Sequence, residues 1–351
     1  MSRKILTSLL LALLLAPAAF AQSLRLPDES QAATVAQRLG LTDITITYHR
    51  PQVKGRPVFG GLVPYGQVWR AGANENTTIT FSDDVTVEGK PLAKGTYGLH
   101  MIPTQNNDVT VIFSKANTSW GSYTYDEKED ALRVQVKAQP SEFHESLTYD
   151  FADVKPDSAV ATLQWDKTAI PFRVGIDLNK TVEARVSDTL RGQLHWQWEA
   201  FDQAANYILA HKGNLNDALA YSSRSVELQP HFSNLFTQAQ VFDALGKKSE
   251  ATAAMAKAEP LADNLELYNY ARWQQRHGQA AQSYATFRKV VQKSPDHWVA
   301  HLALARVYSN DKKFAEAQKE MDACMSSAPA DLRNDLKPLQ AKLQSNQDIN
   351  Q

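Results

Sequence analysis

The chain has 351 residues, a formal net charge of −1 at pH 7 and one cysteine. A charge so close to zero provides no basic field for nucleic acid or for an anionic membrane surface, and a single thiol excludes an internal disulfide framework. The length exceeds what one hydrophobic core usually serves, so we expect two domains.

Residues 1–21 have the pattern of a cleaved secretory signal. Arg3 and Lys4 give a basic start, residues 5–15 are apolar, and residues 19–21 supply a small-x-small cleavage motif. The apolar run is shorter than the roughly 20 residues that a bilayer core requires, which favours cleavage over a spanning helix. We therefore expect a periplasmic or secreted protein with no membrane span after signal cleavage. Because no cysteine directly follows the cleavage site, a lipid anchor is not expected.

A polar lead follows over residues 22–40, and its stretch from Glu29 to Leu39 is compatible with a helix. From Ile44 polar and apolar residues alternate, which is typical of a strand with one buried face. Similar short runs recur up to residue 177, with turn signals and no helical pattern between them. We therefore expect an antiparallel β-sandwich or open barrel over residues 41–177. Beyond Ile44–His49, the expected strands are Thr77–Phe81, Val85–Glu88, Tyr97–Ile102, Val109–Ser114, Leu132–Ala138, Ser146–Phe151 and Val160–Trp165.

Several blocks of this β-rich half carry a family resemblance. They are the sequence YHRPQVKGRPVFGGLVPYGQVWRAGANENTTITF with its continuation to Pro103, the stretch Trp120–Lys128, and Leu132–Val134. Together they resemble the bacterial domain-of-unknown-function family 2911 over roughly Leu41 to Val174. The resemblance implies an exported β-rich domain that often accompanies other modules, and it implies no particular activity.

Polar and aromatic side chains gather on two loops of the β-rich half, and two interpretations remain open. If the loops meet at one end of the sandwich, they form a small pocket with flat apolar walls, suited to a sugar or another small polar ligand. Alternatively, Trp69 plugs the end of the sandwich while Arg70 and Glu75 pair and fix the loop. The candidate ligand-binding residues are Arg50, Trp69, Arg70, Asn74, Glu75, Trp120 and Tyr125, with Tyr123 in the same cluster.

Other chemistry has little support in the sequence. His49, His100 and His144, together with Glu75, raise the possibility of a metal site, but no two histidines have a His-x-His or His-x3-His spacing. There is no Gly-x-Ser-x-Gly elbow, and Ser122 lies in an aromatic loop. Phosphate-binding glycine loops are also lacking. We therefore assign no catalytic residue, metal or cofactor.

From about Val186 the hydrophobic period changes to that of helices, and the chain becomes self-similar. Units that begin at Gly213, Gly246, Gly278 and Lys312 follow one another at intervals of 32 to 34 residues. This pattern resembles the tetratricopeptide repeat, a helix-turn-helix unit in which small residues let the paired helices approach closely.

The repeats set the layout of the second half. Residues 178–198 form a linker and helix start, residues 199–329 hold four units, and residues 330–351 supply a capping helix and tail. Four units exceed the three or so that a continuous core needs. In this register Cys324 occupies a small-residue position on a second helix, so we interpret it as a buried apolar side chain.

The resemblance also implies a peptide-binding concave surface lined by the first helix of each unit. Aromatic and guanidinium groups there suit an extended segment with an acidic group, which arginine can hold bidentately. The competing interpretation is that these are solvated residues on a scaffold. The groove residues in the register are Tyr207, Phe236, Gln240, Tyr268, Arg272, Arg276 and Arg306, with Gln203 and Asp243 beside them.

The functional expectation is an exported, non-catalytic binding or scaffold protein of the cell envelope that holds a protein or peptide segment in its helical repeats. The alternative is a domain that binds a small ligand such as a carbohydrate, or a hydrolytic enzyme, acting through the loop from Trp69 to Glu75.

Overall fold

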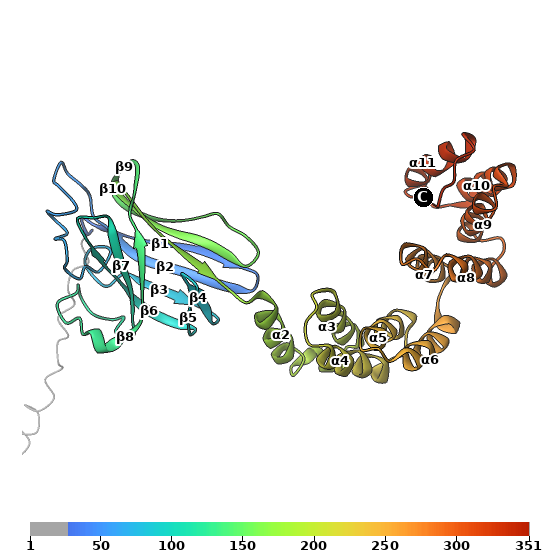
Figure 1. Cartoon of the computed structure of the whole chain (residues 1–351), viewed down its shortest axis with the longest axis horizontal. Helices are drawn as coiled ribbons and strands as arrows, with labels where there is room; N and C mark the ends of the chain where they lie inside the picture. The colour runs from blue at the N-terminus through green and yellow to red at the C-terminus, as the bar shows by residue number, and fades with distance from the viewer. Residues whose placement is uncertain (1–26, 351) are drawn as a thin grey trace, which may run out of the picture. The chain divides into compact units, whose positions relative to one another are not determined.

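The computed structural model describes residues 27–350 and divides into two compact units, with a boundary between Thr181 and Val182. Figure 1 labels the elements of both units, each of which is described here by itself. The expected secretory signal, residues 1–21, lies outside the described residues. Within residues 27–350, no helix combines the length and apolar character needed to cross a bilayer.

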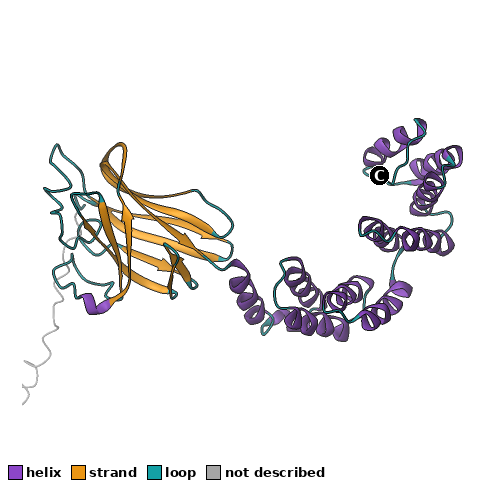
Figure 2. Ribbon diagram, in the orientation of Figure 1, coloured by secondary structure: helices purple, strands orange, loops and turns teal. Residues whose placement is uncertain are grey.

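The first unit consists of two antiparallel sheets, drawn in orange in Figure 2. The sheets do not close into one barrel, so the expected class of an antiparallel sandwich followed by a helical solenoid is confirmed. In spatial order, the larger sheet contains β1 (Gln31–Leu39), β2 (Thr42–Arg50), β3 (Thr78–Phe81), β6 (Gly95–Pro103), β7 (Asp108–Ser114) and β8 (Asp130–Lys137). The smaller contains β5 (Lys90–Leu92), β4 (Val85–Val87), β10 (Ser158–Gly175) and β9 (Gln139–Ala152).

Alternating side chains of the two sheets form the core of the first unit. In β2 and β6, Ile46 and Leu99 are fully buried, and β10 contributes Leu163 and Phe172. This is the period-two pattern that a strand with one buried face requires. The long segment between β2 and β3 therefore starts and ends on strands held rigidly by the core.

The stretch Gln31–Leu39 is a strand and not the helix that the sequence suggested. It pairs with β2 along its whole length, from Gln31 opposite Arg50 to Leu39 opposite Thr42. Ala33 and Val35 pack against the core. Helix propensity is a weak local preference, and nine residues are too few to hold a helix by themselves. Pairing with a strand only two residues away overrides it.

The second unit is helical. After α2 (Leu178–Thr189) and the short η2 (Gln193–Trp196), eight helices pack in consecutive pairs, and a last helix follows. The pairs are α3 (Trp198–Ala210) with α4 (Leu215–Leu228), α5 (Phe232–Ala244) with α6 (Lys248–Ala258), α7 (Asn264–Arg276) with α8 (Ala280–Lys293), and α9 (Trp298–Asn310) with α10 (Phe314–Ser327); the last helix is α11 (Arg333–Gln344).

One junction between pairs differs from the others. At α4–α5 and α8–α9 the second helix of a pair packs against the first helix of the next, but α6 makes hardly any contact with α7. The single turn η3 (Glu259–Leu261), which contains Pro260, lengthens the connection there. One face of α6 is therefore left without the helix that would normally cover it.

Candidate functional site

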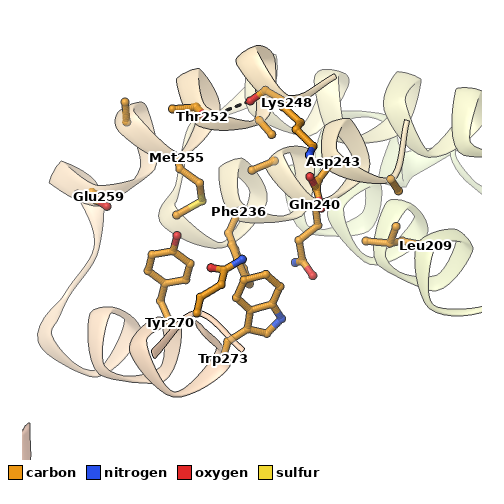
Figure 3. Close-up of a pocket in the computed structure, with 15 residues that line it drawn as sticks. Leu209, Phe236, Gln240, Asp243, Lys248, Thr252, Met255, Glu259, Tyr270 and Trp273 are labelled. Carbon is orange, nitrogen blue, oxygen red and sulfur yellow. Dashed lines mark hydrogen bonds between the residues drawn. The ribbon is translucent and has the colours of Figure 1, made fainter. Parts of the chain in front are cut away.

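The uncovered face of α6 borders an open groove of about 740 Å³. Figure 3 shows α5 and α6 along one side and the aromatic side chains of α7 on the other. The volume lies within the range of roughly 300–1,000 Å³ that is usual for ligand pockets. The lining residues are Leu209, Phe236, Ala239, Gln240, Asp243, Ala244, Lys248, Ala251, Thr252, Met255, Ala256, Glu259, Tyr270, Trp273 and Gln279.

Aromatic rings form the apolar end of the groove. The ring of Phe236 meets Tyr270 and Trp273 edge to face, with centroids 5.4 and 5.2 Å apart. Tyr270 and Trp273 themselves stack at 6.1 Å. Edge-to-face and offset contacts are the geometries in which aromatic rings attract one another, so the cluster is a firm wall. Met255 points from α6 towards Tyr270 in Figure 3 and adds a deformable apolar surface.

The rim of the groove is polar, with charges at separate places. Near the aromatic wall, Glu259 forms an ion pair with Lys289 of α8. Burial raises the pKa of the half-buried Tyr270, and the charge of Glu259 raises it further, so its hydroxyl stays protonated and able to donate. At the other end, Asp243 points towards Lys248 in Figure 3. The groove therefore combines an apolar floor with donors and acceptors at its edges.

The groove contains only part of the residue set expected from the repeat pattern. Phe236 and Gln240 line it, as does the neighbouring Asp243. Tyr207 stacks on His211 at 4.0 Å instead, and Arg276 is exposed at the end of α7.

Three further expected residues lie on other surfaces of α7 and α9. Arg272 bonds to Gln275 on its own helix. The side chains of Tyr268 and Arg306 are buried and bonded to each other.

The pattern missed the groove residues of α6 because it placed binding on first helices alone. Thr252, Met255 and Ala256 lie on a second helix, which a regular solenoid would cover. The signal that could have found the groove is the pair Tyr270 and Trp273, since two large aromatics three residues apart form an apolar stripe outside the repeat pattern.

In the first unit, Trp69 and Arg50 lie in structural positions. The indole of Trp69 stacks on Trp165 at 5.8 Å and donates a hydrogen bond to the carbonyl oxygen of Gly72 at 3.0 Å. The guanidinium of Arg50 donates to the carbonyl oxygen of Leu147 and to the hydroxyl of Thr148. These contacts hold the loop against the sandwich.

Arg70 lies beneath two exposed aromatic rings. Its guanidinium carbon is 5.5 Å from the centroid of Trp120, which stacks nearly parallel to Tyr123 at 6.0 Å and 9°. Trp120 is 58% exposed and Tyr123 is 81% exposed, so together they form a flat aromatic platform. Gly121 has a positive φ of 71°, and an added Cβ there would press on both Tyr123 and Arg70. The platform therefore depends on glycine at this position.

Glu75 pairs with a residue other than the one expected. Its carboxylate lies 3.4 Å from the Nε2 atom of His49, and within the described residues no ion pair joins it to Arg70. The backbone of Glu75 forms a bridge to that of Trp120, which holds the two loops together. Asn74, which has a positive φ of 56°, receives a hydrogen bond at its carbonyl oxygen from the amide of Gly121. The expected ion pair of Arg70 with Glu75 does not form, although the charge of Glu75 still acts on Arg70 and opposes the lowering of its pKa by burial.

Tyr125 belongs to a network beside this platform. Its hydroxyl donates to Asp130 at 2.6 Å and accepts from Arg133. Burial raises its pKa to about 12, and the bond to Asp130 contributes. His100 lies against the Tyr125 ring.

The Nδ1 atom of His100 is 2.9 Å from the hydroxyl of Ser122. The Oδ2 atom of Asp130 bonds to Tyr125 and Arg133, whereas its buried Oδ1 has no hydrogen-bond partner. Among residues 27–350, the structure shows no hydrogen bond from a carboxylate to this imidazole, the contact that orients a general base in a catalytic triad. No cluster of metal-ligating side chains occurs within residues 27–350.

The fold and the site define a class: a two-sheet antiparallel domain followed by helical repeats with an open groove. Known protein families match a part of each half. Residues 30–174 match the family described as Protein of unknown function (DUF2911), and residues 275–343 match the tetratricopeptide repeat. The resemblance of both halves seen in the sequence is therefore confirmed. None of the curated proteins matches the chain.

Three solved structures similar to the chain each cover about half of it. The APC/C hetero-tetramer Cut9–Hcn1 has 12% sequence identity and a TM-score of 0.31, covering 48% of this chain and 37% of that one. YrrB, described as a TPR protein with an unusual peptide-binding site, has 14% identity and a TM-score of 0.27, covering 46% and 88%. A tetratricopeptide repeat protein from Parabacteroides merdae ATCC 43184 has 15% identity and a TM-score of 0.30, covering 48% and 69%. Similarity at this level does not assign a function.

Proposed function

We propose that the protein is an exported scaffold of the cell envelope, and that the groove bordered by α5, α6 and α7 holds an amphipathic helix of a partner protein. The observation that carries this proposal is the uncovered face of α6, which lies open at the one pair junction where second and first helices do not pack. Helical repeats of the tetratricopeptide kind form extended binding surfaces for proteins, which supports a protein segment as the ligand.

The chemistry of the groove favours a helix as the occupant. Ala251 and Ala256 line it with small side chains, which let a neighbouring helix approach closely. Phe236 and Trp273 supply anchor surfaces for large apolar side chains spaced one turn apart. The polar rim, including Gln240, matches the polar face of an amphipathic helix.

A matched pair of substitutions on α6 tests the groove. Ala256 lines it, whereas Ala253 is exposed on the same helix outside it. A photo-crosslinking residue at Thr252, also in the groove, would capture the partner in cells. We expect Ala256→Glu to reduce the yield of the crosslinked product at least tenfold, because it places a carboxylate against the apolar floor.

The control is Ala253→Glu, which should leave the crosslink unchanged. Mapping the crosslinked product should locate the contact on an amphipathic helix of one protein. Equal losses with both variants, or crosslinks scattered over unrelated proteins, would exclude the groove as the binding site.

Export is supported by the signal-like pattern of residues 1–21. Cell fractionation followed by N-terminal sequencing tests it. We expect the protein outside the cytoplasm with a mature start near Gln22, and a cytoplasmic protein with an intact start would refute the export proposal.

A second candidate function concerns the first unit. The platform of Trp120 and Tyr123 over Arg70 favours binding of a small polar ligand with a flat apolar face, such as a carbohydrate. We expect Trp120→Ala to abolish ligand-induced changes in melting temperature on a carbohydrate panel while leaving the melting temperature of the free protein nearly unchanged. If the domain also hydrolyses the carbohydrate through Glu75, Glu75→Ala should abolish hydrolysis while the carbohydrate still binds.

A further inference from the structure

The chain beyond α11 turns back and crosses the face of two repeat helices. Asn346 adopts a positive φ of 52°, and the amide of Gln347 donates to the carbonyl oxygen of Lys342 at 2.9 Å, which ends the helix in a tight turn. Residues 348–350 then run against α9 and α7. This face is the one that the repeat pattern assigned to peptide binding through Tyr268, Arg272 and Arg306.

Ile349 is the centre of the contact. It is only 1% exposed and belongs to the same hydrophobic core as α7 and α9. Its amide donates to the hydroxyl of Ser309 at 3.0 Å, and its carbonyl oxygen accepts from the guanidinium of Arg306 at 2.5 Å. Both backbone polar groups of one residue are thus met by side chains of α9. A groove that binds an extended peptide does the same, fixing the backbone by hydrogen bonds and one side chain by burial.

The neighbours of Ile349 extend the contact to both helices. The carboxylate of Asp348 accepts from Ser309 at 2.8 Å. The side-chain amide of Asn350 donates to the backbone oxygen of Arg306 at 3.0 Å and accepts from Gln275 of α7 at 3.1 Å. Three successive residues therefore each make a specific polar contact, which exceeds what covering an apolar core requires.

Charge at this surface is only partly balanced. Arg306 is 4% exposed, and its guanidinium bonds to the Tyr268 hydroxyl and the Ile349 carbonyl, both neutral. Burial lowers the pKa of the nearby Arg272, and repulsion from Arg306 and then from Arg276 lowers it further. Asp348 is the acidic residue that the tail brings. A segment with additional carboxylates would therefore be attracted more strongly than the tail itself.

We propose that this face of α7 and α9 is a second binding site, for an extended acidic segment of a partner protein with one aliphatic anchor. The chain's own residues 348–350 occupy it as a resident ligand that such a segment displaces. The site is separate from the groove of the proposed function. A helix turns about 100° per residue, so Arg272 and Gln275 face away from Tyr270 and Trp273, which line the groove.

The test uses the full chain and a version ended after Gln344, with an amidated fluorescent peptide of residues 345–350 as probe. We expect the shortened chain to bind the peptide at least tenfold more tightly than the full chain, as measured by fluorescence anisotropy. A peptide carrying Gln347→Glu should bind more tightly still, and one carrying Ile349→Asp should not bind. Ala256→Glu in the groove should leave these affinities unchanged, which separates this site from the proposed function.

A second variant, the full chain with Ile349→Asp, covers the case in which the shortened chain does not fold. This variant keeps the full length of the tail but replaces the apolar anchor. The tail should then leave the site, which becomes available to the probe peptide. Circular dichroism reports whether each variant is folded. A folded variant that fails to bind the peptide overturns the proposal, and so does loss of the helical fold in both variants, because the tail would then be part of the core.

Discussion

Burial decides which side chains of this protein can react in the folded state. Cys324 has no exposed surface, as expected from its place in the repeat pattern, and burial raises the pKa of its thiol to about 11. At neutral pH it is a protonated thiol among apolar side chains, and the thiolate is the form that reacts.

Cys324 should therefore be inert in the native protein. We expect a water-soluble disulfide reagent to modify it only after denaturant is added. Cys324→Ser should lower the free energy of unfolding by about 1–3 kcal/mol, because it buries a hydroxyl without a partner, and Cys324→Ala should cost less. Rapid labelling of the native chain would show that α10 opens far more readily than its packing indicates.

His100 provides a test by pH. Its pKa is lowered from 6.5 to about 4, chiefly by burial; the charge of Asp130 opposes this lowering and that of Arg70 adds to it. The unfolded chain therefore takes up the proton first, so the free energy of unfolding is unaffected by this group above pH 6.5 and falls as the pH drops towards 4. The loss amounts to about 3 kcal/mol.

The free energy of unfolding of the full chain is measured in urea at pH 7 and at pH 4, with hydrogen exchange of the β6 amides as the signal. We expect this free energy to decrease less between the two pH values in His100→Gln, which cannot titrate, than in the unchanged chain. Identical decreases would mean that His100 does not contribute to acid sensitivity.

Individual elements differ in how well local sequence predicts them. Strands β2 and β6 follow the alternation of their residues, because one face of each is buried. Strand β1 lacks that signal, since Ala33 and Val35 are only partly buried and its conformation comes from its partner. The helical unit departs from the repeat pattern at two places. The separation of α6 from α7 accompanies the inserted turn η3, and the return of Ile349 depends on contacts with α7 and α9; repeat spacing encodes neither.

The site residues divide in the same way. Phe236 and Gln240 could be assigned to the groove because repeat register fixes the face of a helix. The partner of Glu75 could not, because the backbone at Glu75 is held by a bridge to Trp120, about 45 residues along the chain. Residue type identified the two loops that carry the candidate ligand-binding residues. Which side chains contact one another within these loops could be determined only from the folded structure.

Helix α7 separates the two proposed binding surfaces, and its start is fixed by a capping box. The carboxylate of Asp263 accepts from the amide of Glu266, and the carboxylate of Glu266 accepts from the amide of Asp263, both at 2.8 Å. We expect Asp263→Ala to lower the free energy of unfolding of the second unit by about 1 kcal/mol. Asp263→Ser, which retains a capping oxygen, should recover most of that loss when all three chains are unfolded by urea titration. If serine does not recover it, the side chain of Asp263 does not stabilise the helix as a cap.

At the scale of the whole molecule, each unit has its own core. Most of the buried apolar side chains of residues 27–181 form one cluster, and those of the helical unit form others that do not include them. We therefore expect residues 27–177 and residues 178–350, expressed separately so that α2 stays whole, to fold with the circular dichroism of a β protein and of an α protein. Their summed spectra should reproduce that of the full chain, and an unfolded fragment would show that the cores depend on each other.

The pairing of β10 with β4 also sets an order in time. Val174 lies opposite Val87, so the smaller sheet cannot be completed until the ribosome has made almost all of the first unit. Each helix pair needs only its own thirty or so residues, and local contacts form much faster than distant strand pairs. In a chain that folds from the fully unfolded state, the first unit therefore completes its fold after the helix pairs have formed, and its incomplete sheet presents open strand edges during that interval.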